Sequence, residues 1–179
     1  MSILKVARMG HPVLRTPTRP IETSEIATPE VQRLIDDMFD TMHEYRGIGL
    51  AAPQVHRELR LFVAGIDDPE ASIPPVVMFN PVVEPVGSKI GEDWEGCLSI
   101  PDLRGRVPRF VEVQVRALDR GGRPILMTAS GFPARVIQHE TDHLDGILFL
   151  DKMTSLNSLT FLTEYGRYWD KEATVTPET

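Results

Sequence analysis

Hydrophobic residues recur at intervals of three and four along residues 31–45, and acidic residues lie mostly on the opposite side. This spacing places the apolar side chains on one face of an α-helix. The segment Thr28-Pro29-Glu30 favours a helix start, because it supplies a capping hydroxyl, a proline at the first position and an acid in the first turn. We therefore predict a helix from Pro29 that ends near Gly47. Its buried face consists of Val31, Leu34, Ile35, Met38, Met42 and Tyr45.

Two later stretches carry the same helical pattern. In residues 131–144, Pro133 lies in the first turn, where proline is compatible with a helix. Gly146 follows this stretch, and glycine often ends helices. We predict a largely buried helix there. Residues 155–169 predict a second, amphipathic helix. Its apolar stripe consists of Leu156, Leu159, Leu162 and Tyr165.

Shorter apolar runs predict β-strands. Residues 59–66 and 76–86 are two such runs, joined by a polar turn that contains Asp67, Asp68 and Pro69. Prolines are frequent around the second run. They are Pro74, Pro75, Pro81 and Pro85. Because proline donates no backbone hydrogen bond, these residues predict sheet edges and bends and argue against a central parallel sheet.

Apolar and polar residues alternate along residues 107–118, which predicts a further strand. The apolar positions are Val111, Val113, Val115 and Ala117. Gly121-Gly122 then predicts a hairpin turn, and residues 124–127 predict the returning strand. We expect this antiparallel pair to pack its apolar face on the core.

The composition is that of an ordinary globular protein, with 179 residues, 41% hydrophobic and 25% charged. The length favours one domain over residues 1–179, with residues 170–179 as a frayed tail. A net charge of −7 argues against direct nucleic-acid binding, since that needs clustered Lys and Arg. The single cysteine excludes an intramolecular disulfide. The sequence has no membrane span and no signal-peptide core, so we expect a cytoplasmic protein.

The segment Gln138-His139-Glu140-Thr141-Asp142-His143 is the main candidate for chemistry. On a helix, His139 and His143 project from nearly the same side, so both can bind one metal ion. Glu140 lies beside them, within reach of a water on that ion. Two imidazoles are one ligand short of a catalytic site, which usually has three protein ligands and a water.

The third ligand is open to more than one reading. Cys97, in the segment Glu95-Gly96-Cys97-Leu98-Ser99, is either a small buried apolar residue or a thiolate that completes a Cys-His-His set. A zinc endopeptidase would instead recruit a later carboxylate such as Asp145 or Asp151. A structural metal site would need a fourth protein ligand, and no second cysteine or fitting histidine is evident.

The segment Gly47-Ile48-Gly49-Leu50-Ala51-Ala52-Pro53-Gln54 also has two readings. It is a turn after the first helix, or it is a place where backbone without side chains lets a ligand approach closely. Gln54 offers an amide donor at its end. The segment is not a dinucleotide-binding fingerprint, because the later glycine is missing and a helix precedes it where a strand is required.

These three segments together resemble the three signature segments of the peptide deformylases, in the order of that family. The resemblance extends from the first residues to the metal-binding helix and beyond. It implies an α+β fold in which antiparallel β-sheets surround a central helix that carries the HExxH motif, with a C-terminal helix. It also implies one catalytic domain over residues 1–179, which removes the formyl group from the N-terminal formyl-methionine of newly made chains.

The resemblance implies a role for each motif residue. The metal ligands would be Cys97, His139 and His143. Glu140 would be the general acid and base, and Gln54 and the backbone N–H of Leu98 would face the developing oxyanion. A divalent metal lowers the pKa of bound water to about 7, so hydroxide forms at neutral pH. The family implies Fe(II) as the native ion, with zinc, nickel or cobalt as substitutes.

The expected substrate is an N-formyl-methionyl nascent peptide, which makes the ribosome near its exit tunnel a candidate partner. We expect the peptide to lie extended against backbone near Ile48, Gly49 and Gly96, like an added strand. Ile48 and the helix face beside His139 are candidates for the methionine pocket. No membrane association is expected.

Three arginines remain, Arg104, Arg106 and Arg109, for which we expect surface or structural contacts. We suggest that one of them pairs with Asp142 and so orients the metal-binding helix.

Overall fold

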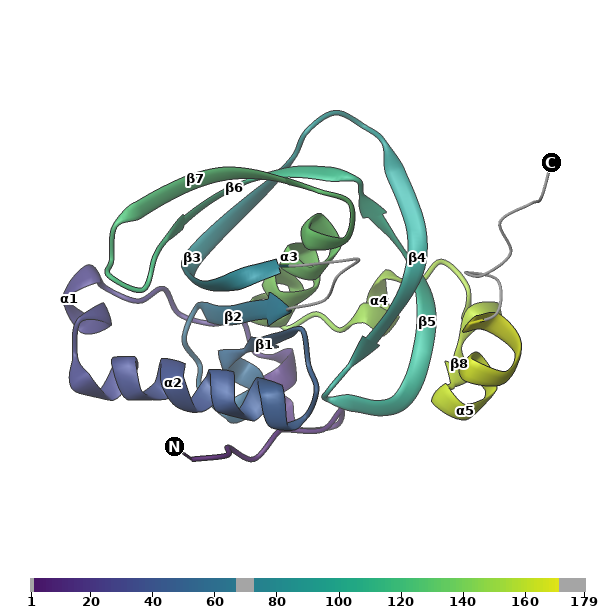
Figure 1. The fold of residues 1–179 in the computed structure, drawn as a ribbon, viewed down its shortest axis with the longest axis horizontal. Helices are drawn as coiled ribbons and strands as arrows, with labels where there is room; N and C mark the ends of the chain where they lie inside the picture. Colours follow the sequence, from purple (N-terminus) through teal and green to yellow (C-terminus); the bar gives the residue numbers. More distant parts are fainter. Residues whose placement is uncertain (1, 67–72, 171–179) are drawn as a thin grey trace.

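A computed structural model describes residues 2–66 and 73–170 and contains two antiparallel sheets (Figure 1). The larger sheet has the strand order β1-β2-β3-β6-β7, and the smaller has the order β4-β5-β8. The strands of the larger sheet are β1 (Gly49–Ala51), β2 (Leu61–Ile66), β3 (Ile73–Pro85), β6 (Glu112–Leu118) and β7 (Pro124–Ser130). Those of the smaller sheet are β4 (Ile90–Cys97), β5 (Ile100–Phe110) and β8 (Thr160–Phe161).

Two long helices accompany the sheets, and both were predicted. They are α2 (Pro29–Glu44) and α3 (Gly131–Leu144). The shorter α-helices are α1 (Thr23–Ile26), α4 (Phe149–Lys152) and α5 (Leu162–Glu164). Single helical turns of other types are η1 (Pro12–Arg15), η2 (Ala52–Val55), η3 (Leu156–Ser158) and η4 (Tyr165–Trp169). The predicted α+β class with antiparallel sheets around the HExxH helix is confirmed.

Strand β2 is buried on both faces, because each face supports one long helix. Leu61 and Val63 pack with α2, whereas Phe62 and Ala64 pack with α3. Antiparallel strands often have one solvated face, but this one reads as a continuous apolar run. The sheet therefore lies between α2 and α3, and α3 is enclosed deep in the molecule (Figure 1).

A side-chain cap begins α2, and residues in the left-handed conformation follow the ends of both long helices. Thr28 caps α2 by accepting a hydrogen bond from the Val31 N–H, as predicted. The helix stops before Gly47, and Arg46 takes the left-handed conformation with φ of 55°. Tyr45, predicted as part of the buried face, is 47% exposed. After α3, Gly146 has φ of 74°, and an added Cβ there would lie 2.8 Å from the backbone of Arg15.

The prediction that the prolines place β3 at a sheet edge is wrong. Strand β3 is central and pairs with β2 on one side and β6 on the other. Its pairing register shifts between Phe79 and Val82, where Pro81 lies, and again opposite Pro74 and Pro75. The missing N–H groups therefore fall where the ladder is already irregular. The predicted polar turn with Asp67, Asp68 and Pro69 lies outside the described residues.

The predicted strand 107–118 is divided at Val111 into β5 and β6, which belong to different sheets. The apolar alternation survives in β6, where Val113, Val115 and Ala117 are buried against α3. The predicted β6–β7 hairpin is confirmed. The strand β4 and the first half of β5 were not predicted, because Glu92-Asp93-Trp94-Glu95 shows no simple alternation.

The predicted helix 155–169 is wrong over its first half, where only the single turn η3 is helical, and the α-helix begins at Leu162. Thr160 and Phe161 form β8, which pairs with Arg104 and Leu103 of β5. The backbone hydrogen bonds that these two residues form with the open edge of β5 favour a strand over the helix that the apolar spacing predicts. The stripe residues Leu156 and Leu162 remain exposed, at 68% and 41%.

Among the described helices, none combines the length and the apolar character that crossing a membrane requires.

Candidate metal centre and active site

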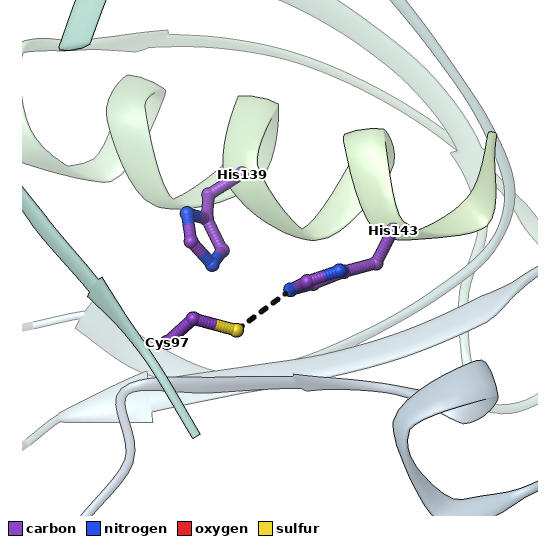
Figure 2. Close-up of side chains that lie close together, drawn as sticks. All are labelled: Cys97, His139 and His143. Carbon is purple, nitrogen blue, oxygen red and sulfur yellow. Dashed lines mark hydrogen bonds between the residues drawn. The ribbon is translucent and has the colours of Figure 1, made fainter. Parts of the chain in front are cut away.

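The helix α3 positions two histidines toward one point. His139 and His143 lie one turn apart, and their ring centroids are 4.9 Å apart. Figure 2 shows both imidazoles projecting from α3 toward the sulfur of Cys97. The α-helical period produces this arrangement directly from the spacing of the two residues.

Cys97 completes the cluster from the end of β4. Its Sγ lies 3.2 Å from His143 Nε2 (Figure 2). One donor atom from each of Cys97, His139 and His143 lies within 4.8 Å of the others, and all three residues are buried. Donors bound at about 2.0–2.3 Å to one tetrahedral ion lie about 3.5 Å from one another, so these residues fit a metal ion.

The protonation of the cluster also suits a metal. Burial raises the pKa of the Cys97 thiol, but His143 and His139 beside it outweigh burial and lower this pKa well below its ordinary value. The thiolate, which is the form that binds metals, is therefore favoured. Thiolate and imidazole donors select zinc or an iron-type divalent metal over magnesium or calcium.

Glu95 fixes the orientation of His139. Its Oε2 lies 2.8 Å from His139 Nδ1, which leaves Nε2 to face the cluster. Two buried arginines hold Glu95, with Arg109 donating to both carboxylate oxygens at 2.9 and 3.0 Å and Arg135 donating to Oε1 at 2.8 Å. Burial raises the pKa of Glu95, but His139 and Arg109 outweigh it and lower the pKa to about 2. The carboxylate is thus ionised and can orient a ligand histidine.

Arg109 also joins this network to the far end of α3. Its Nη1 pairs with Asp142 Oδ2, so the suggested arginine–Asp142 pair exists and Arg109 is its cation. Arg104 and Arg106 do not take this place. Arg104 donates to the carbonyl of Leu103, and the Arg106 guanidinium lies 5.3 Å from the centroid of the Trp94 ring.

We expect Asp142→Ala to weaken metal binding about 10- to 100-fold, the range typical for groups that support metal ligands. The substitution leaves Arg109 with one carboxylate fewer and releases its hold on α3. Metal titration with a competing chelator measures the affinity. Asp145→Ala is the matched control, because Asp145 pairs with Arg60 outside the cluster and is 45% exposed. Equal affinities in both variants would contradict the expectation.

Glu140 is buried beside the cluster and faces the cleft. It is 4% exposed, and its Oε2 has no hydrogen-bond partner among the described residues. Burial raises the pKa of Glu140 to about 7. A group with a pKa near neutrality can both accept and return a proton.

Gly49 allows Glu140 to occupy this position. A Cβ on Gly49 would lie 2.3 Å from Glu140 Oε1, which is far inside van der Waals contact. We expect Gly49→Ala to lower kcat/KM by about 10²-fold through displacement of the carboxylate, as for a misplacement of about 1 Å. Metal content should stay unchanged. Gly166→Ala is the control, since a Cβ there meets no atom within 4 Å, and equal loss in both variants would contradict the reasoning.

The predicted donor Gln54 lies against the cluster. It is buried, its Oε1 accepts from the Ala51 N–H at 2.8 Å, and its Nε2 donates to Ser99 Oγ at 3.2 Å and to Cys97 Sγ at 3.5 Å. Leu98 occupies the turn between β4 and β5 and lines the same cleft.

The cleft over the cluster has a volume of about 920 Å³. Its walls include all three predicted substrate-binding residues, Ile48, Gly49 and Gly96. Strand β1 is the edge of the larger sheet and β4 is the edge of the smaller, and both line the cleft. Two sheet edges therefore flank one cavity that contains Cys97 and Glu140.

Sequence reasoning missed Glu95, Arg135 and Ser99 as members of the site. Glu95 and Ser99 stood in a recognised segment but had no assigned role, and Arg135 precedes His139 by one helical turn on α3. The alternative ligands Asp145 and Asp151 lie outside the cluster, where they pair with Arg60 and Arg15. An HExxH helix beside a cysteine that can complete a metal site, with a buried carboxylate facing a cleft, is the arrangement of a metal-dependent hydrolase.

Comparison with known proteins gives the family. The model of the polypeptide deformylase family matches residues 3–158. The chain is 42% identical to peptide deformylase 1 of Nitrosomonas europaea over 164 residues, which cover 89% of this chain and 92% of the relative. It is 41% identical to peptide deformylase 1 of Prochlorococcus marinus, covering 92% of this chain and 88% of the relative.

Solved structures agree with this. A class I type b peptide deformylase from Acinetobacter baumannii, bound to Met-Ala-Ser, superimposes with a TM-score of 0.81 at 38% identity and covers 86% of this chain and 100% of its own. An actinonin complex of a deformylase from Synechococcus elongatus gives a TM-score of 0.78 at 36% identity, with coverages of 98% and 89%. The chain belongs to the polypeptide deformylase family.

Proposed function

We propose that Cys97, His139 and His143 hold the metal ion with which this peptide deformylase hydrolyses the N-terminal formyl group of newly synthesised polypeptides. Glu140 is the general acid and base of the reaction. The observation that carries the proposal is the position of Glu140, buried next to the ligand cluster and facing the cleft with Oε2 unpartnered among the described residues.

The chain supplies proton transfer at Glu140. A divalent ion, when bound, provides a Lewis acid and lowers the pKa of water. Glu140 accepts the proton of the attacking water and returns it to the departing amino group. Proton transfer by a placed side chain contributes about 10²–10⁴-fold to the rate.

Gln54 and the Leu98 N–H stabilise the charge that develops on the formyl oxygen. The Gln54 side chain is held in place by the Ala51 N–H and Ser99 Oγ, and the N–H that donates to Cys97 Sγ in this structure turns to the formyl oxygen when the substrate binds. A preset donor of this kind is worth about 2.7–4 kcal/mol in a comparable site.

The substrate peptide extends between the two sheet edges. Ile48 and Gly49 in the β1 region and Gly96 in β4 line the cleft at these edges, which supports pairing of their backbone groups with an added strand. Such pairing ignores side-chain identity, which suits an enzyme that acts on many nascent chains. The Met-Ala-Ser bound to the Acinetobacter relative has the sequence of a deformylated N-terminus and supports this use of the cleft.

A pair of peptides tests the activity. We expect rapid hydrolysis of formyl-Met-Ala and no cleavage of an internal peptide with blocked ends by the same anaerobic preparation. A small zinc endopeptidase shares the HExxH helix and would cleave the blocked peptide. Cleavage of that peptide alone would reject the proposed reaction.

We assign Fe(II) as the native ion, with zinc, nickel or cobalt as substitutes for the same ligands. Affinity order alone does not select iron, so the assignment depends on supply as well as on the ligands. We expect the iron-loaded enzyme to lose activity in air, because both Fe(II) and its thiolate ligand oxidise. The nickel-loaded enzyme should retain activity over the same period. Equal decay of the two forms would exclude an oxygen-sensitive iron–thiolate centre.

The ribosome near the exit tunnel is the partner that this activity implies, since the substrate is a chain that has just emerged. The same reasoning places the enzyme in the cytoplasm.

A further inference from the structure

Three exposed cationic side chains line the cleft. Lys5 and Arg8 belong to the N-terminal segment, and Arg46 follows α2. All three line the cleft that contains Cys97 and Glu140, and all three are exposed. We call Lys5, Arg8 and Arg46 the basic rim.

The backbone holds the basic rim in place beside the catalytic groups. The Ala7 N–H donates to the Gln54 carbonyl at 2.7 Å, and the Met9 N–H donates to the Ser99 carbonyl at 2.8 Å. Upstream, the Leu4 N–H donates to Thr41 Oγ1 on α2 at 2.9 Å. The segment that carries Lys5 and Arg8 is therefore hydrogen-bonded to the backbone of Gln54 and Ser99. It is also hydrogen-bonded to α2, the helix that Arg46 follows.

No ion pair joins the basic rim to a carboxylate in residues 2–66 and 73–170. The other charged residues that line the cleft are Glu95, Asp102, Arg104, Arg135 and Glu140. Glu95 and Arg135 neutralise one another inside the protein, and Glu140 lies at the floor. A chain with a net charge of −7 thus gathers cations without a carboxylate partner among the described residues along the cleft of its proposed active site.

The positive potential of this region also acts on a neighbouring histidine. The pKa of His56 is lowered from its ordinary value by burial first, and then by repulsion from His11 and Lys5. The His11 and His56 rings are in contact, with centroids 4.7 Å apart.

We propose that the basic rim binds carboxylate side chains of the substrate, at the third to fifth residues of the formylated chain. The inference rests on the proposed function and adds to it a preference for acidic nascent chains. An extended peptide advances about 3.3 Å per residue, so these side chains lie roughly 7–13 Å beyond the methionine. A cleft of about 920 Å³ is at the upper end of the range for ligand pockets and has room for several residues.

The position of the rim favours a peptide over RNA. Nucleic-acid binding depends on many phosphate contacts spread over an outer surface. Here three cations line the same cavity as Cys97 and Glu140, so the side chains of a peptide bound in that cavity share it with these cations. Unpaired cations at a cleft also raise the association rate of acidic ligands.

Matched peptides test the proposal. One series has formyl-Met-Ala followed by three residues, with Asp at position three, four or five, and the reference series has Asn at the same place. At low salt we expect at least one Asp peptide to show about three- to tenfold higher kcat/KM than its Asn partner, mainly through KM, as for one or two exposed charge pairs. At about 1 M salt the ratio should approach one, because the Debye length falls to about 3 Å.

Charge variants assign the effect to the rim. The triple variant Lys5→Gln, Arg8→Gln, Arg46→Gln should bring the Asp/Asn ratio close to one. The control Arg33→Gln, Lys89→Gln, Arg123→Gln removes the same charge from exposed residues outside the cleft and should keep the wild-type ratio.

The outcomes separate the two levels of the proposal. If the Asn peptides are not deformylated, the proposed function itself fails. Deformylation of Asp and Asn peptides at equal rates by the wild type would overturn only the role of the basic rim, as would equal loss of the ratio in both triple variants. A rim variant that keeps the ratio but no longer sediments with ribosomes would assign these cations to RNA.

Discussion

Glu140→Gln should lower kcat by about 10²–10⁴-fold while the protein keeps its metal and its fold. Glutamine fills nearly the same volume as glutamate, but its amide cannot accept the proton of the attacking water. Because Glu140 is not one of the three clustered donor residues, the ion should remain bound. Deformylation kinetics and metal analysis on the same preparation measure both properties.

Glu92→Gln is the matched control for Glu140→Gln, since Glu92 is an exposed carboxylate of β4 that does not line the cleft. The control should keep its activity. If Glu140→Gln were as active as the wild type, another group would act as the base, and the assigned mechanism would be wrong.

Glu95→Gln should destabilise the protein by about 3–5 kcal/mol, the usual cost of removing one partner from a buried ion pair. Arg109 would lose the carboxylate that accepts two of its hydrogen bonds, and Arg135 would lose its ion pair with the same group. Both arginines are buried. His139 would also lose the ionised group that fixes its ring, so metal affinity should fall by about 10- to 100-fold. Urea unfolding of the metal-free protein measures the first effect, and chelator competition measures the second.

The control for Glu95→Gln is Glu84→Gln, because Glu84 pairs with Arg116 at the surface, where both side chains are more than half exposed. Exposed pairs contribute about 0–1 kcal/mol, so this variant should unfold almost like the wild type. Similar losses for both variants would show that the buried network does not carry the stability assigned to it.

The features that sequence predicted well are those fixed by local spacing. His139 and His143 share a helix face because the helical period alone places them there. The start of α2 follows from the capping sequence at Thr28, and the β6–β7 hairpin follows from alternation around Gly121-Gly122. Cys97 lies 42 residues before His139, so its spacing left two interpretations open, and the family resemblance favoured the metal ligand before the structure brought the two residues together.

The features that sequence missed depend on contacts between distant residues. Glu95 contacts Arg109 of β5 and both Arg135 and His139 of α3. No local sequence pattern predicts that these three side chains meet at one carboxylate. Thr160 and Phe161 leave the helical pattern because β5 offers an open edge, which the local sequence does not record. The central position of β3 was hidden for a related reason, because the irregularities that accommodate its prolines exist only in the paired sheet.

The central claim is that Cys97, His139 and His143 bind one ion together. X-ray absorption at the metal edge, on anaerobically purified protein of known metal content and activity, tests it most directly. We predict one ion per chain with one sulfur and two imidazole nitrogens bound to it, and loss of the sulfur contribution in Cys97→Ser. A fully metallated, active sample with no sulfur at the ion and a thiol free to react would contradict the account.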